Sequence, residues 1–178
     1  LFYFNKFNFK TMAEKKLVFQ KFDGTKIEDV NQYVKDWIVQ YPHSEITIGC
    51  DSQAYARYVK YSVVIVMHVF YESKETNPDR VGHGAHVISA TVIDRSKGLK
   101  SDLYTKLWAE AMYTVEAAQM LDDCNKKIKI HLDYNSKEEA YSNVLYASGI
   151  GFIKGMGYEA CGKPYAWASS NVADHLCR

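Results

Sequence analysis

Several features are missing from this sequence, and each absence argues against a class of protein. No run of about 18 apolar residues occurs, so the sequence offers no candidate transmembrane helix. The cysteines form no C-x-x-C pair and have no histidine at zinc-site spacing, which argues against a zinc domain. No G-x-x-x-x-G-K-[ST] motif is present, which argues against a P-loop nucleotide-binding protein. We therefore expect no membrane partner.

Strong charge of either sign is also missing. The formal net charge is +1, so a surface that binds nucleic acid would have to be a local basic patch. The four cysteines are scattered, and they could form two disulfides. Nothing else resembles a small disulfide-stapled secreted domain, so free thiols in a reducing cytoplasm are favoured.

The chain of 178 residues is long enough for one domain with a substantial core, and no repeat or linker divides it. The segment Leu1–Thr11 is rich in Phe and Asn, and Met12-Ala13-Glu14 after it is typical of a translation start. We expect residues 1–16 to be a dispensable N-terminal extension, and residues 17–178 to form the domain.

Hydrophobic patterning predicts an α/β fold. Thr25-Lys26-Ile27-Glu28 has the form of a capping box and predicts a helix that ends before Pro42. The later helices are expected at Ser101–Asp122, at Asn143–Met156, and in a short final helix capped by Ser169 or Ser170. The strands are expected at Glu45–Gln53, Val59–Tyr71, Ala85–Asp94, Lys127–Tyr134 and Tyr158–Lys163. The prediction is a mixed five-stranded sheet in the order β-β-β-α-β-α-β-α, with an extra N-terminal helix.

Four acidic residues stand at chemically suggestive positions. Asp51 follows the first strand in Ile48-Gly49-Cys50-Asp51-Ser52-Gln53, and Glu110 interrupts the apolar stripe of a predicted helix. Asp133 is near the end of the fourth strand, and Asp174 is on the final helix. Clustered carboxylates suit Mg²⁺ or Mn²⁺, because these ions prefer oxygen ligands and two of them can clamp a phosphodiester.

Each acid also has an ordinary structural interpretation. Asp51 could form a turn, Asp133 could end its strand, and Asp174 could be favoured near the start of a helix. Glu110 is harder to explain in this way, because a buried carboxylate without a partner is costly. Taken together, the four acids favour a metal site.

Four segments resemble the ribonuclease H-like YkuK family of bacterial proteins, which is part of the ribonuclease H superfamily. These segments are IGCDSQ, HLDYN, GFIKGMGYEACGKP and AWASSNVADH. The resemblance implies a ribonuclease H fold and two-metal hydrolysis of phosphodiester bonds. It also implies that Asp51 bridges both ions, and that Glu110, Asp133 and Asp174 complete the catalytic and metal-binding set.

Related nucleases are disfavoured by specific differences. A proofreading exonuclease would have D-x-E on the first strand, whereas Ser52 and Gln53 follow Asp51 here. A Holliday-junction resolvase of this fold would place a glutamate on the fourth strand, where this sequence has Asp133.

Candidate substrate-binding residues surround these acids. Ser52 and Gln53 could hydrogen-bond the substrate, and Arg57 and Lys163 could contact phosphates. His175 could assist a leaving group. Each of the five could equally be an ordinary polar surface residue.

We therefore predict a divalent-metal-dependent nuclease that acts on RNA, on an RNA–DNA hybrid or on DNA. One alternative is a non-catalytic ribonuclease H-like module that binds nucleic acid or a protein. Another is a metal-dependent hydrolase of small phosphorylated nucleotides. The sequence does not indicate an oligomeric state.

Overall fold

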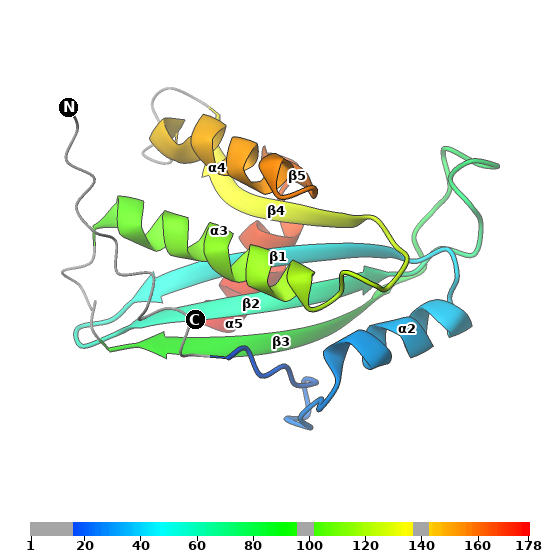
Figure 1. Ribbon diagram of the computed structural model, residues 1–178, viewed down its shortest axis with the longest axis horizontal. Coiled ribbons are helices and arrows are strands. Elements are labelled where there is room, and N and C mark those ends of the chain that lie inside the picture. The colour runs from blue at the N-terminus through cyan, green and yellow to red at the C-terminus, as the bar shows by residue number, and fades with distance from the viewer. Residues whose placement is uncertain (1–15, 96–101, 137–142) are drawn as a thin grey trace.

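A five-stranded mixed sheet forms the centre of the molecule (Figure 1). The structure is a computed structural model and describes residues 16–95, 102–136 and 143–178. The strand order is β3-β2-β1-β4-β5. The bounds are Glu45–Ala54 for β1, Val59–His68 for β2, Ala85–Asp94 for β3, Ile128–Asn135 for β4 and Glu159–Lys163 for β5. The predicted α/β class and mixed sheet are confirmed.

The first three strands form an antiparallel meander, in which residues 55–58 join β1 to β2 and residues 69–84 join β2 to β3. The β1–β2 register pairs Asp51 with Ser62, and β2 pairs with β3 along its whole length. The chain then returns through a helix, so β4 pairs with β1 in parallel, and β5 pairs with β4 in parallel. β1 is therefore the central strand of the sheet.

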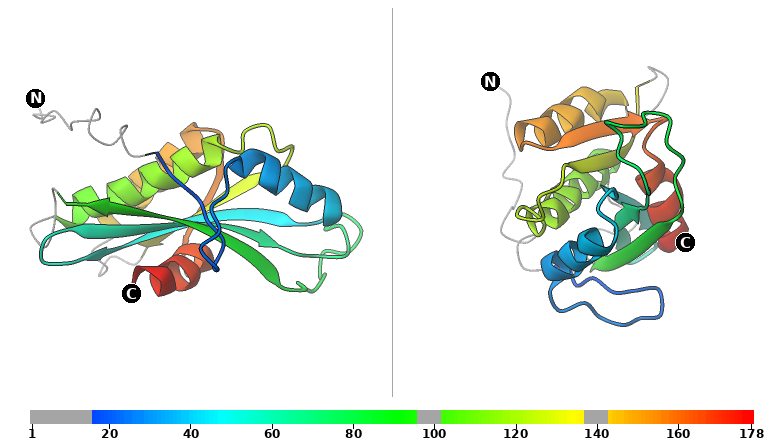
Figure 2. Two further views of the ribbon diagram at one scale, coloured as in Figure 1. Left: turned by 90° about the horizontal axis from the view of Figure 1, so that it is seen from below. Right: turned by 90° about the vertical axis from the view of Figure 1, so that its right-hand side faces the viewer.

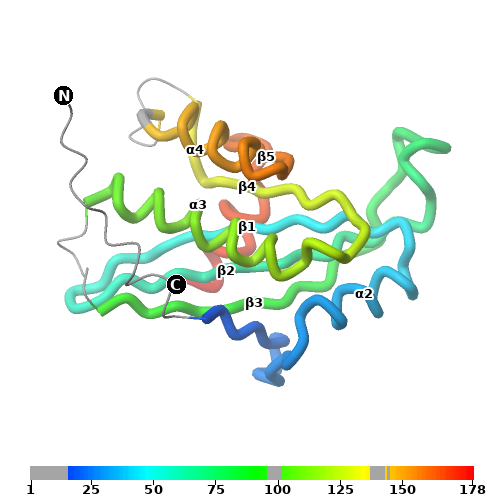
Figure 3. The backbone as a smooth tube through the Cα atoms, viewed as in Figure 1, coloured from blue at the N-terminus to red at the C-terminus, as the bar shows by residue number. Residues whose placement is uncertain are grey.

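Helices cover both faces of this sheet (Figure 2). One face carries the longer helices, which are α2 (Val30–Gln40), α3 (Leu103–Gln119) and α4 (Asn143–Gly155). The tube in Figure 3 shows the chain crossing from β5 to the opposite face. There it forms the π-helix η2 (Ala168–Ala173), followed directly by α5 (Asp174–Cys177).

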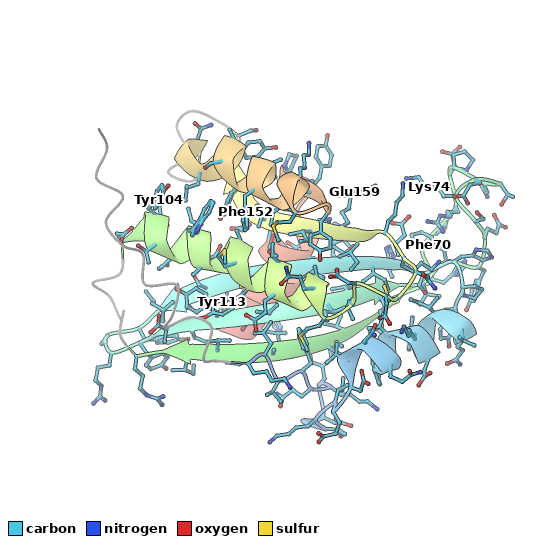
Figure 4. The ribbon with its side chains drawn as sticks, viewed as in Figure 1. Phe70, Lys74, Tyr104, Tyr113, Phe152 and Glu159 are labelled. Carbon is cyan, nitrogen blue, oxygen red and sulfur yellow. The ribbon has the colours of Figure 1, made fainter. Side chains whose placement is uncertain are left out.

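The main core lies between the sheet and the three longer helices. Ile46, Ile48 and Cys50 of β1 project into it, in the alternation expected of a strand. Figure 4 shows Phe152 extending from α4 toward α3, where its ring centroid lies 5.1 Å from that of Trp108. A smaller cluster on the opposite face joins Val64 to Ala168.

The absence of a side chain at Gly49 allows η2 to lie directly on β1. A Cβ at this position would be 2.6 Å from both the backbone carbon of Ala168 and the nitrogen of Ser169. We expect Gly49→Ala to lower the free energy of unfolding by about 1–3 kcal/mol, measured by urea denaturation. Gly151→Ala is a matched control, because a Cβ there meets no atom within 4 Å. Equal stability of the two variants would contradict the prediction.

Two predicted helix starts were wrong. The first helix begins at Val30, and its N-cap is Asp29, whose carboxylate accepts a hydrogen bond from the Gln32 N–H at 2.9 Å. The Thr25–Glu28 segment is extended instead, because the Ile27 N–H donates to the Phe19 carbonyl. In the helix that carries Glu110, Asp102 is the cap, and Ser101 lies outside the described residues.

The C-terminal helix also begins differently from the prediction. Neither serine caps it, because the Ser169 hydroxyl donates to the Ala166 carbonyl and the Ser170 hydroxyl donates to Asp133. No helix among the described residues is long and apolar enough to cross a membrane. All four cysteines are free thiols. The predicted extension at residues 1–16 lies almost wholly outside the described residues.

Candidate functional site

Asp51 and Asp133 lie where two parallel strands stop pairing. The β1–β4 register ends at Cys50 and Leu132, and an aspartate comes next on each strand. Strand alternation directs both aspartates toward the face that η2 and α5 cover, opposite to buried Cys50 and Leu132. The topology therefore brings together two acids that are far apart in the sequence.

Glu110 approaches from α3, on the other face of the sheet. It is 3 % exposed, and its Oε1 accepts a hydrogen bond of 2.6 Å from the Ser52 hydroxyl. Its Oε2 is buried without a hydrogen-bond partner. Burial raises the pKa of Glu110 to about 8, with a further contribution from the Asp51 charge. This carboxylate is therefore costly to ionise when no cation is nearby.

Asp51 shares this electrostatic environment. Burial, together with the charges of Asp133 and Asp174, raises its pKa to about 6, whereas the hydrogen bond from the Ser52 backbone N–H opposes the shift. Lys106 lies one turn before Glu110 on α3, and its charge lowers the pKa of both Asp51 and Glu110. Asp51 is therefore within electrostatic range of the other three acids, although Glu110 lies on the opposite face of the sheet.

Asp133 differs from these two acids because both of its carboxylate oxygens have partners. The Lys163 Nζ lies 2.9 Å from Oδ2, and the Ser170 hydroxyl donates to Oδ1. Lys163 ends β5 and Ser170 belongs to η2, so three separate elements meet at this carboxylate.

Asp174 is the first residue of α5 and forms an ion pair with Arg178 one turn later, at 2.6 Å. The position of α5 is fixed by hydrogen bonds to its last carbonyls. The Lys60 Nζ donates to the Leu176 carbonyl at 2.6 Å, and the Tyr55 hydroxyl donates to the Cys177 carbonyl at 3.0 Å. Residues of β2 and of the β1–β2 turn therefore position the helix that carries the fourth acid.

The four acids do not form a complete set of ligands for a divalent cation. Within the part of the chain that the structure describes, no group of three or more His, Cys, Asp or Glu residues could hold a metal ion. The partnerless Glu110 Oε2 is nevertheless an oxygen donor that a hard cation would satisfy. Glu110 therefore has an oxygen without a partner that a cation could use, whereas both oxygens of Asp133 are already bonded to Lys163 and Ser170.

The candidate substrate-binding residues fall into two groups. Ser52 and Lys163 contact the acids Glu110 and Asp133 directly. The other three are exposed at the surface, and they are Gln53, Arg57 and His175. Substrate binding by all five stays a prediction.

His131, which shares a strand face with Asp133, has a packing role. It is 2 % exposed, and its Nδ1 accepts a hydrogen bond of 3.1 Å from the Ala168 N–H. Burial lowers its pKa to about 4, so the ring is neutral at pH 7 and helps to seat η2 on the sheet.

Sequence reasoning missed two residues of the site. Lys106 could have been found, because it precedes Glu110 by four residues and so lies on the same helix face. Ser170 carried no such signal, because its bond to Asp133 depends on how η2 packs against β4.

The sheet order, the flanking helices and the acids around β1 and β4 define an α/β protein with an acidic centre at the ends of two parallel strands. In a comparison with protein families, residues 27–178 match the family described as Ribonuclease H-like. The chain belongs to this family and has its fold. Searches of curated proteins and of solved structures find no match.

Proposed function

We propose that this protein is a divalent-metal-dependent nuclease that hydrolyses phosphodiester bonds of nucleic acid. The observation that carries the proposal is buried Glu110, with one oxygen lacking a partner, beside an Asp51 whose pKa is also raised. Perturbed acids of this kind are concentrated at catalytic centres. Membership of the Ribonuclease H-like family supports a nucleic acid as the substrate class. Within that family, the sequence segments around the acids support a place in the YkuK group.

Asp51 and Glu110 are the residues that would hold Mg²⁺ or Mn²⁺. The bound cation would supply charge stabilisation to the phosphate and lower the pKa of a water molecule. Asp133 and Asp174 complete the set that the family resemblance implies, and with two ions they would share the coordination.

Neighbouring side chains orient these acids. The Ser52 hydroxyl holds Glu110 Oε1, so the other oxygen of this carboxylate is left for a ligand. Lys163 and Ser170 fix Asp133 from two directions. Exposed Arg57 and Gln53, close to Asp51 in the chain, are available to contact the nucleic-acid backbone.

A non-catalytic nucleic-acid-binding module is the second candidate. One observation favours it: Asp133 and Asp174 are both paired with basic residues of the same chain. A module without catalytic activity could keep these pairs as structural contacts. It would bind nucleic acid without cleaving it.

We expect cleavage in Mn²⁺ or Mg²⁺ of at least one member of a panel of labelled RNA–DNA hybrid, single-stranded RNA, single-stranded DNA and branched DNA. EDTA should abolish the cleavage, because the acids are negatively charged and the bound cation is what stabilises the charge on the phosphate. Gel analysis of the products separates endonuclease from exonuclease activity. Binding of a panel member without cleavage in either metal would support the non-catalytic module instead.

The free thiols favour a reducing cytoplasm as the location.

A further inference from the structure

We propose that Tyr165 stacks on an unpaired base of a bound nucleic acid while Lys163 contacts a phosphate of the same strand. The preferred ligand is then a single strand rather than a continuous duplex. The inference rests on the proposed nuclease function and deepens it, because it assigns the class of nucleic acid that the site accepts and a residue that selects it.

Tyr165 is the most exposed aromatic side chain among the residues that the structure describes. It is 76 % exposed and lies in the link between β5 and η2. Tyr71, in the β2–β3 link, is also exposed, but its ring lies 4.2 Å from the ring of His83, centroid to centroid. Tyr165 has no such ring contact with any described residue. The faces of its ring are therefore open to a flat ligand.

The backbone around Tyr165 is fixed, although its ring lies in solvent. The Tyr165 N–H donates to the Gly162 carbonyl at 3.0 Å, and the Tyr165 carbonyl accepts from the Cys161 thiol at 3.6 Å. The next residue, Ala166, is buried, and its carbonyl accepts a hydrogen bond of 3.0 Å from the Ser170 N–H. A tyrosine side chain has only two χ angles, so on a fixed backbone it loses little conformational entropy when it binds a ligand.

Tyr165 also lies close to the acidic site in the chain. It follows Lys163 by two residues, and two residues span at most about 7 Å. The Lys163 Nζ lies 2.9 Å from Asp133 Oδ2, and Lys163 pairs with Asn135 of β4. The exposed ring is therefore held near Asp133, where the proposed chemistry would take place.

Lys163 supplies the charge that complements a nucleic-acid strand. Its ammonium has three N–H donors, so one can bond Asp133 while the others remain for a phosphate oxygen. The side chain is 40 % exposed, so a ligand in solvent can reach it. A cation and an open aromatic ring two residues apart match the phosphate and the base of a strand.

The aromatic ring is what selects an unpaired base. In a continuous duplex each base is stacked between its neighbours, so its faces are covered, whereas the bases of a single strand can splay out and stack on a side chain. Every base has a π-face, so this contact tolerates any sequence. We therefore expect a preference for single strands without a preference for a particular base.

The test is fluorescence anisotropy of the full chain with labelled single-stranded oligo(dT), single-stranded oligo(rU) and a blunt RNA–DNA hybrid, in EDTA so that no strand is cleaved. We expect wild type to bind at least one single strand more tightly than the hybrid. Tyr165→Ala should weaken single-strand binding about tenfold, as expected for the loss of one stacked base, and should leave hybrid binding unchanged. Tyr165→Phe keeps the ring and should bind as wild type does.

Tyr71→Ala is the matched control, because it removes an exposed tyrosine beyond the end of β2 that is remote from Asp51. It should bind as wild type does. The dependence of binding on salt separates stacking from charge. Tyr165→Ala should keep the wild-type slope of log affinity against log salt concentration, because stacking releases no counterions, whereas Lys163→Met should reduce the slope by about one.

Unchanged single-strand affinity in Tyr165→Ala, an equal loss on the hybrid, or an equal loss in Tyr165→Phe would overturn the inference. Wild type that binds no single strand would overturn it too. Circular dichroism reports whether each variant is folded, and Tyr165→Gln replaces the alanine variant if that one unfolds. The proposed function fails separately. Single-strand binding that depends on Tyr165, without cleavage of any panel member in Mn²⁺ or Mg²⁺, contradicts the nuclease and leaves the stacking role intact.

Discussion

Asp51→Asn is expected to lower Mn²⁺-dependent cleavage on the order of 10²–10³-fold, because it removes a charge that organises the centre of the site. Asp51 follows the last β1–β4 pair. After burial, the charge of Asp51 is the largest contribution to the raised pKa of Glu110. Asparagine keeps the size of the side chain and removes the anion. The fold should persist, since Asp51 does not belong to the hydrophobic core.

Initial cleavage rates on the preferred substrate, with melting temperatures in EDTA, measure this effect. Asp79→Asn provides a control, because Asp79 is an exposed aspartate in the β2–β3 link. It should retain wild-type activity. If Asp51→Asn cleaved as fast as wild type, the acidic centre would not be the catalytic one.

Glu110→Gln is expected to stabilise the metal-free protein on the order of 3 kcal/mol at pH 7 while it removes activity. The folded pKa of Glu110 is about 8, compared with an ordinary value of 4.5. Each pKa unit corresponds to about 1.4 kcal/mol. The folded state binds the proton more tightly than the unfolded state, so wild-type stability is highest below pH 4.5 and falls as the pH rises to about 8. Glutamine has no proton to lose and therefore lacks this part of the decline.

Urea denaturation at pH 5, 6, 7 and 8 in EDTA measures how the free energy of unfolding of wild type and of Glu110→Gln changes with pH. Asp51, with a pKa of about 6, contributes to the wild-type slope, and the loss of the Glu110 charge reduces its contribution too. Mn²⁺ should then stabilise wild type by about 2.7 kcal/mol at one hundred times its dissociation constant, and should stabilise the glutamine variant less. Parallel slopes for the two proteins would refute the buried-charge interpretation.

Local patterns were sufficient to predict most of the fold. The β-branched run of β2 and the alternation in β3 marked their strands, and a helix between β3 and β4 required a parallel return. The start of α2 was mispredicted because Thr25–Glu28 satisfies a capping box locally, while a long-range bond from Ile27 to Phe19 holds the segment extended. In this segment, tertiary pairing therefore overrides the local helix propensity.

The acids of the site could be predicted from their positions in the sequence, but their partners could not. Glu110 was conspicuous because a carboxylate interrupted an apolar stripe. The contacts of Asp133 with Lys163 and Ser170 connect elements that are distant in the sequence, and no spacing rule indicates such contacts.

The parallel pairing of β1 with β4 has a kinetic consequence. β2 joins β1 through the short turn at residues 55–58, whereas β4 must close a long loop before it pairs with β1, and such non-local pairings form slowly. We therefore expect Asp51 and Asp133 to meet late in folding, after the β1–β2 hairpin has formed. We expect a substitution that relieves their mutual repulsion to slow unfolding more than it speeds folding, because contacts that form late are mostly absent from the transition state.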